Sequence, residues 1–394
     1  MPEQSLLFEA LKDNNYEEAR ELLKDELNLP ADLSSFERIR LFDNLIEHKA
    51  FDIILLFVDH KLIETDIFEY DTFENTILQK IVSKVQDDEK SLSFLDEFLA
   101  KLENINDSVN SQTLLAYALE AGAAPFIIEK LISAGSDTGW LNNAEQSFLH
   151  QVASNNRIQP DTAAAYLRLL ISEGLDVNAQ DIVKSTPLII AISRNKTHLI
   201  DILLENGASA NIPDKEEETA FYHAVVHQQN FKLYQKLKEY ESPEFEHVSK
   251  SGSTLLFEFL KRLNRAEDSQ LLFLKELLED GADMYTPSVF YGRERTPAEI
   301  AAEKPFPVFN TIMQLEKLDI TGTDQNGNSL LHQVCGFDIN FDQEAAKDTY
   351  RKAKLLIEKG ADVNLTNNKD ETPLTLAMSD NLKTKTVELL LKNK

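Results

Sequence analysis

The chain has 394 residues, of which 42% are hydrophobic, and it carries a formal net charge of −27. A negative field of this size disfavours binding to nucleic acid and to anionic membrane surfaces, and it favours binding to a basic partner. The alternative is that the charge only keeps an extended protein surface soluble. The sequence has no apolar run of about 18 residues, no charged and apolar N-terminal region typical of a secretory signal, and a single cysteine, Cys335, which excludes disulfide frameworks and multi-cysteine metal sites. We therefore expect a cytoplasmic protein.

The first 110 residues predict pairs of helices without a recurring turn between the pairs. Ser5 and Thr76 each open a short apolar stretch of helical length, and Arg40 stands in the same slot between them. We interpret residues 1–110 as divergent repeats that include a polar cap, because a terminal unit has only one neighbour. Within this part, the acidic and aromatic residues 68–74 either attract a basic partner or place Phe68 and Phe73 in the core.

From residue 111 onward the same set of packing residues returns every 33 to 43 residues. A serine or threonine opens each unit as a predicted helix cap, at Thr113, Ser147, Thr186, Thr219, Thr254, Thr296, Ser329 and Thr372. Five units close with a glycine that predicts a left-handed turn after the second helix: Gly135, Gly174, Gly207, Gly281 and Gly360. A period of this length predicts a solenoid, in which each helix pair buries its apolar face against its neighbours.

Two of these motifs resemble the ankyrin repeat family. Thr186-Pro187-Leu188 matches the start of the first helix of that family, and Gly360-Ala361-Asp362 matches the turn that closes its second helix. The resemblance implies an all-α, ankyrin-type solenoid of about eleven stacked helix-turn-helix repeats with hairpin-like loops. It implies two regions, divergent N-terminal capping repeats over 1–110 and a continuous solenoid of ankyrin repeats over 111–394.

Catalytic motifs are absent from the sequence, which has no glycine-rich phosphate loop, no His-Glu-x-x-His and no Gly-x-Ser-x-Gly. We therefore expect no enzymatic activity and no cofactor. His223 and His227 have the spacing of two metal ligands on one helix face, but no third ligand follows them at a suitable distance. The sequence therefore predicts no metal site.

Several other polar residues have structural interpretations. Asp324 begins a polar hairpin tip, since the glycine and the bidentate acid of a calcium loop are missing. Cys335 is predicted to be a small buried thiol. His150 and His332 occupy the histidine position of the family, where the resemblance implies hydrogen bonds to loop backbone.

The resemblance also implies a partner-binding surface made by the hairpin tips and the ends of the first helices. In the sixth and seventh repeats the corresponding residues are Ile182, Val183, Arg194, Lys215, Glu216, Glu218 and His227. A basic stripe in the next two repeats, with aromatic residues beside it that we expect to be exposed, adds Lys250, Lys261, Arg262, Tyr285, Phe290, Tyr291, Arg293, Arg295 and Lys304. Two structural alternatives stay open: the cations only relieve the surrounding negative field, and the aromatic residues pack the long loop down. Residues 284–293 predict a lengthened loop between two repeats.

The sequence thus predicts a non-enzymatic, monomeric protein that binds a protein partner, with basic regions on the partner favoured by the net charge. We expect it to bind neither nucleic acid nor membranes. Two alternatives stay open: a bacterial immunity protein or an effector delivered into another cell, and an architectural subunit of a larger complex.

Overall fold

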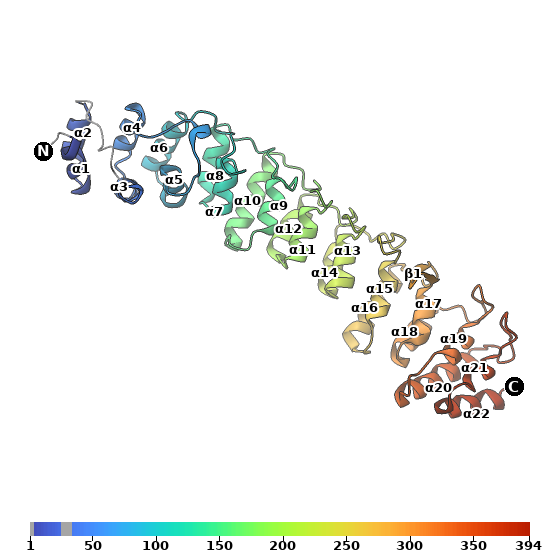
Figure 1. Ribbon diagram of the computed structural model, residues 1–394. Coiled ribbons are helices and arrows are strands. Elements are labelled where there is room, and N and C mark those ends of the chain that lie inside the picture. Colours follow the sequence, from blue (N-terminus) through green and yellow to red (C-terminus); the bar gives the residue numbers. More distant parts are fainter. Residues whose placement is uncertain (1–3, 25–33) are drawn as a thin grey trace. The chain divides into compact units, whose positions relative to one another are not determined.

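The computed structural model describes residues 4–24 and 34–394 (Figure 1). The described chain is mostly helical and divides into two compact units, Met1–Ser209 and Ala210–Lys394. None of the described helices combines the length and the apolar run that crossing a membrane requires. The all-α class is confirmed, whereas the count of eleven repeats and the boundary near residue 110 stay predictions.

The first unit consists of helix pairs stacked in chain order. Its elements are α1 (Gln4–Lys12), α2 (Tyr16–Lys24), α3 (Ser35–Glu47), α4 (Phe51–Asp59), the 3₁₀ turn η1 (Ile67–Glu69), α5 (Ile77–Lys84), α6 (Glu89–Leu99), α7 (Leu114–Ala121), α8 (Pro125–Ser133), α9 (Phe148–Ser154), α10 (Pro160–Ser172), α11 (Pro187–Ser193) and α12 (Thr197–Glu205). The first helices α3, α5, α7, α9 and α11 contact one another in succession, and so do the second helices α2, α4, α6, α8, α10 and α12. The core therefore lies between neighbouring pairs, as a solenoid requires.

The second unit repeats this arrangement and adds a short sheet. Its elements are α13 (Ala220–Tyr222), the π-helix η2 (His223–His227), α14 (Phe231–Lys238), α15 (Leu255–Arg262), α16 (Asp268–Glu279), β1 (Ser288–Phe290), β2 (Arg293–Arg295), α17 (Pro297–Glu303), α18 (Phe306–Gln314), α19 (Leu330–Gly336), α20 (Gln343–Glu358), α21 (Pro373–Ala377), the 3₁₀ turn η3 (Asn381–Lys383) and α22 (Thr384–Lys392). First helices contact in the order η2, α15, α17, α19 and α21, and second helices in the order α16, α18, α20 and α22.

The predicted anchors are helix caps from Thr76 to the last repeat. Thr186 shows the arrangement: its side chain accepts a hydrogen bond from the amide of Ile189 at 3.3 Å, and Pro187 occupies the first helical position, where no amide is needed. The residues that cap in this way are Thr76, Thr113, Ser147, Thr186, Thr219, Thr254, Thr296, Ser329 and Thr372.

The two earlier anchors are wrong. Arg40 lies inside α3, whose cap is Ser34, and Ser5 lies inside α1. Ser34 and Glu37 form a capping box, in which the Ser34 amide donates to Glu37 Oε2 at 2.9 Å. This box caps the helix six residues before Arg40. The sequence prediction aligned only the apolar stretches of the repeats, and it therefore placed the start of α3 too late in the chain.

The five glycines that close repeats adopt the predicted left-handed backbone. Their φ angles lie between 86° and 109°, a region that residues with a side chain rarely adopt. In the divergent N-terminal part, Phe73 is buried at 3% exposure while Phe68 is 72% exposed, so only the first of these rings belongs to the core.

Lysine ammonium groups tie neighbouring repeats together in a way that the sequence did not reveal. Lys352, on α20, donates to the carbonyls of Ala302 and Lys304 at the end of α17, each at 2.7 Å. The same link to the end of the preceding first helix is made by Lys196, Lys304 and Lys383. These four bridging lysines satisfy carbonyls that lack an intrahelical partner and place positive charge at the negative end of a helix.

Candidate functional site

Five hairpin tips are closed by the same side-chain turn. The Oδ1 atom of an aspartate or asparagine accepts hydrogen bonds from the amides two and four residues later, at 2.8 to 3.1 Å. The residues are Asn142, Asp181, Asp214, Asp324 and Asn367. The structural interpretation of Asp324 is therefore confirmed.

Backbone hydrogen bonds also join successive tips within each unit. In the first unit the Ile182 amide donates to the Ala144 carbonyl at 3.0 Å. In the second unit the amides of Lys250, Val289 and Asn368 donate to the preceding tip at 2.9, 2.7 and 2.9 Å. The tips are thus held to one another through main-chain atoms.

The family histidines have the predicted structural role. His150 donates from Nε2 to the Ser185 carbonyl at 3.0 Å, and its Nδ1 accepts from the Ser147 amide at 3.2 Å. His332 likewise donates from Nε2 to the Glu371 carbonyl at 3.1 Å. Burial lowers the pKa of both rings, which favours the neutral form that accepts at Nδ1. Cys335 is fully buried, and burial raises the pKa of its thiol to about 12.

In the first unit, the predicted contact residues are exposed. Ile182 and Val183 stand at a hairpin tip with 57% and 45% of their surface open, and Arg194 is exposed at the end of α11. A groove of about 560 Å³ lies in the same unit, between the tips and the ends of first helices over residues 111–158. Its lining includes Trp140, the only tryptophan of the chain. Sequence reasoning missed this groove, although a lone tryptophan beside a hairpin tip was a usable signal.

In the second unit, the predicted charges at the next tips form local pairs. Lys250 lies 3.4 Å from Glu216, and both side chains remain more than half exposed. Lys215 is exposed beside Glu216.

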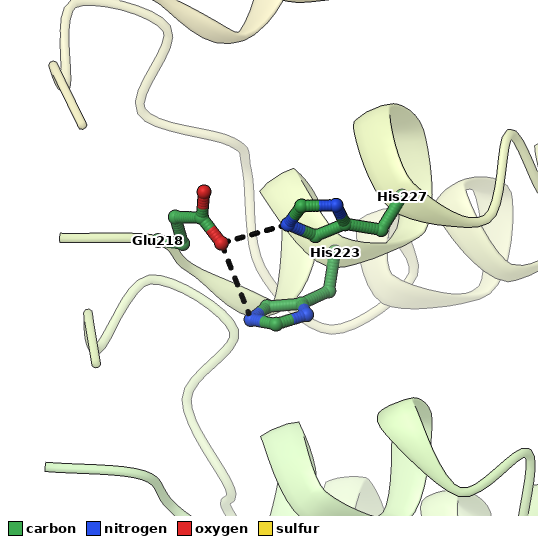
Figure 2. A group of neighbouring side chains, drawn as sticks. All are labelled: Glu218, His223 and His227. Carbon is green, nitrogen blue, oxygen red and sulfur yellow. Dashed lines mark hydrogen bonds and ion pairs between the residues drawn. The ribbon is translucent and has the colours of Figure 1, made fainter. Parts of the chain in front are cut away.

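Glu218 and the two spaced histidines lie together at the base of one hairpin. Figure 2 shows both imidazole rings turned toward the Glu218 carboxylate, with His227 Nε2 2.7 Å and His223 Nε2 4.0 Å from Oε2. One ligand atom from each of the three residues lies within 4.8 Å of the others. Glu218 precedes the histidines in the chain, where no third ligand was sought, and it returns over the start of their helix.

Part of the predicted basic stripe is occupied within the fold. Lys261 pairs with Glu258 at 2.7 Å, and Arg295 pairs with Glu299 at 3.2 Å and Glu303 at 2.6 Å. Lys304 is a bridging lysine, and burial lowers its pKa. The side chains of Arg262 and Arg293 are exposed, and within residues 4–24 and 34–394 neither side chain forms a hydrogen bond or ion pair. Among the basic residues of the stripe, only these two arginines have side chains without a partner in the described residues, since Lys250 pairs with Glu216 at the surface.

The predicted long loop over 284–293 is largely a β-hairpin. β1 and β2 pair antiparallel, with Phe290 opposite Arg293, and the turn residues Tyr291 and Gly292 have φ angles of 50° and 73°. Such a turn normally holds Asn-Gly, so a tyrosine in its left-handed first position stores strain. Tyr291 is 91% exposed and Tyr285 is 44% exposed.

The expected exposure of Phe290 was wrong. Its ring lies in a partly buried position against Phe257, with ring centroids 6.0 Å apart, and the Lys261 ammonium lies 4.7 Å from the Phe290 centroid. The hairpin folds back onto the preceding repeat and covers this ring.

Comparisons with known proteins agree with this architecture. A family model described as ankyrin repeats, three copies, matches residues 149–246. Protein glp-1 of Caenorhabditis elegans is 26% identical over 203 residues, which cover 48% of this chain and 16% of that protein. A putative ankyrin repeat protein of Rickettsia felis is 28% identical over 177 residues, which cover 45% of this chain and 43% of that protein. The chain thus spans less than half the length of either relative.

Among solved structures, the ankyrin repeat domain of Bcl-3, a member of the IkappaB protein family, is similar at a TM-score of 0.48 and 21% identity, covering 63% of this chain and 98% of that one. The family match over residues 149–246 falls on helix pairs that share the Ser/Thr cap and the hydrogen-bonded tip, and the putative ankyrin repeat protein of Rickettsia felis is similar over nearly half of the chain. We conclude that the chain contains ankyrin repeats, which the family model matches over residues 149–246.

Proposed function

We propose that this chain is a non-enzymatic protein that holds a protein partner against its hairpin tips. Ankyrin repeats are a general protein–protein interaction module. The observation that carries the proposal is the exposure of apolar and aromatic side chains at the tips, above all Tyr291 at 91% in a strained turn. Exposed side chains of this kind in soluble folds mark interaction surfaces, and tyrosine and arginine dominate their binding energy.

The proposed contacts comprise two parts, one in each unit, and each part is a surface by itself. The first part is made of Ile182, Val183 and Arg194. The second part is made of Lys215, Glu216, Lys250, Arg262, Tyr285, Tyr291 and Arg293. At the tips, the backbone that carries Ile182, Val183, Glu216 and Lys250 is fixed by the tip turns and by the bonds between tips, which supports a preorganised surface there.

The net charge of −27 supports a partner with basic regions, because complementary fields raise the association rate. The cations of the contact surface, Arg194, Lys215, Lys250, Arg262 and Arg293, require that the same partner presents carboxylates where it docks. A compartment that leaves Cys335 reduced, such as the cytoplasm, fits the buried free thiol. We propose that the protein is a cytoplasmic monomer and that long-range electrostatic attraction accelerates its association with the partner.

The test is affinity capture from an extract of the source organism, followed by quantitative mass spectrometry. Tyr291→Ala is expected to lower the recovered amount of the specific partner by roughly tenfold or more, as loss of an exposed aromatic hot spot does. With the partner purified, the association rate of the unaltered chain should fall steeply as salt is added.

Phe341→Ala is the matched control. Phe341 is 93% exposed and also has a positive φ of 63°, but it lies in the loop between α19 and α20 rather than at a tip. Its replacement should leave capture unchanged. Equal recovery of the partner with both variants would show that the tips are not the binding surface. An association rate that does not change with salt would exclude a partner with basic regions.

A further inference from the structure

The hairpin that ends at Thr219 brings together three side chains, Glu218, His223 and His227, to which the proposed partner binding assigns no joint role. Glu218 is the last residue before the helix cap, and His223 and His227 are the first and last residues of the π-helix η2. Both rings face the same carboxylate (Figure 2), and their centroids lie 5.0 Å apart. We propose that Glu218, His223 and His227 bind a divalent transition-metal ion, with Zn²⁺ as the best fit.

The donor atoms suit this ion. Zn²⁺ takes imidazole nitrogen and carboxylate oxygen at about 2.0–2.2 Å, so neighbouring ligands of a tetrahedral ion lie roughly 3.3–3.6 Å apart. The separations of Glu218 Oε2 from the two Nε2 atoms, 2.7 and 4.0 Å, lie on either side of this value. All three ligand atoms lie within 4.8 Å of one another, so side-chain shifts of about 1 Å bring them onto one ion. Two histidines and one glutamate leave a fourth position for water.

The backbone builds this geometry. The Gln228 amide donates to the His223 carbonyl at 3.0 Å, five residues earlier, which makes the turn between the histidines wider than an α-helical turn. Single π-turns inside helices are uncommon and frequently occur at functional sites. Here the wide turn places both rings beside Glu218.

Asp214 fixes the other side of the cluster. Its Oδ1 accepts from the Glu218 amide at 3.1 Å, and its Oδ2 accepts from His223 Nε2 at 3.2 Å. The first bond holds the backbone of Glu218, and the second orients the ring of His223. Binding an ion through Nε2 replaces this second bond and requires the neutral ring tautomer that is protonated at Nδ1, so the Nε2 proton goes to solvent while Nδ1 takes one up.

The surroundings allow an ion to enter. The side chain of His227 is 40% exposed, while Glu218 and His223 are 19% and 15% exposed. One ligand thus lies at the surface and two lie beneath it, so the ion loses only part of its water shell. The acidic chain attracts cations to this opening.

The experiment uses the full chain after treatment with a chelator. Zn²⁺ is titrated by calorimetry, and Co²⁺ replaces it as a spectroscopic probe whose visible absorption reports tetrahedral nitrogen and oxygen ligands. We expect one site with micromolar or tighter affinity. His227→Gln and Glu218→Gln should each weaken binding roughly tenfold or more, and Zn²⁺ should raise the Tm of the unaltered chain more than that of either variant.

His48→Gln is the matched control, because His48 is an exposed histidine of the first unit outside this cluster. It should bind Zn²⁺ like the unaltered chain. The exposed position of His227 keeps the fold of its variant intact, which circular dichroism checks. Absence of Zn²⁺ binding, or equal affinity in His227→Gln and the unaltered chain, would overturn the proposal and leave the cluster as a hydrogen-bonded hairpin base. The partner-capture test is independent of this result.

Discussion

Replacing Phe273 by alanine is expected to destabilise the second unit by about 3–5 kcal/mol, the range for removal of a large buried ring. Phe273, on α16, is 2% exposed and contacts three other rings, with centroid distances of 5.1 Å to Phe231, 5.3 Å to Tyr234 and 5.0 Å to Phe259. These rings come from α14 and α15, so the loss weakens the contacts among three helices at once. In a solenoid, such a loss acts mainly on the affected repeats and their neighbours.

The measurement is native-state hydrogen exchange over α14–α16, because partial unfolding of one repeat does not give a two-state melt. Leu272→Ala provides the control, since Leu272 is the adjacent residue of the same helix and is 52% exposed. It should change the opening free energy by less than about 0.5 kcal/mol. Similar effects of the two substitutions would mean that the ring cluster does not hold these repeats.

The second large effect is expected at the bridging lysine Lys352. Lys352→Met keeps the length of the side chain but removes the donor from two helix-end carbonyls, Ala302 and Lys304. Each buried carbonyl left without a donor destabilises the fold by about 1–3 kcal/mol. Part of this loss is offset because the variant no longer buries a charged ammonium group. We expect a net loss of about 2–3 kcal/mol at pH 7 in the free energy that holds α17 and α20 together, measured by urea unfolding with a probe placed on α20, because the whole solenoid does not unfold in one step.

Raising the pH should enlarge the effect of Lys352→Met. Burial lowers the pKa of Lys352 to about 8 from 10.5 in the unfolded chain. Between these values the unfolded chain binds more protons than the folded one, so the stability that Lys352 contributes rises with pH. The neutral amine still donates to both carbonyls without the penalty of a buried charge. The difference between the two proteins should therefore grow by about 2–3 kcal/mol from pH 7 to pH 10.

Lys354→Met controls for the loss of a lysine on the same helix. Lys354 is 54% exposed and forms a surface ion pair with Glu358 at 3.8 Å, so its replacement should be nearly neutral at both pH values. A pH-independent difference for Lys352→Met would show that Lys352 keeps an ordinary pKa in the fold.

The fold was predictable from residue 76 onward because its signals are local. A threonine such as Thr186 caps its helix through an amide three residues away, and a glycine such as Gly207 adopts a positive φ within its own turn. Both signals survive in a single sequence. The start of α3 was not predictable in the same way, because its cap, Ser34, precedes a helix without the family motif.

The candidate sites were less predictable because they depend on which side chains meet in space. The pairs of Lys261 with Glu258 and of Arg295 with Glu299 are three and four residues apart on their segments and were readable from the sequence. The link from Lys304 to the Lys261 carbonyl spans 43 residues and was not. Glu218 was missed as a ligand because the third ligand was sought only among residues that follow His223 in the chain. Glu218 precedes His223, and the turn at Asp214 brings its carboxylate next to the His223 ring.

The hydrogen bonds between hairpin tips have a thermodynamic consequence for recognition. Main-chain atoms of residues such as Ile182, Lys250 and Val289 are already immobilised before any encounter. Docking then restricts only the rotamers of the side chains, at about 0.5–1.5 kcal/mol for each flexible one, and no backbone entropy is lost. A modest contact area can therefore give a long-lived complex, and hydrogen exchange at these amides should be slow even without ligand.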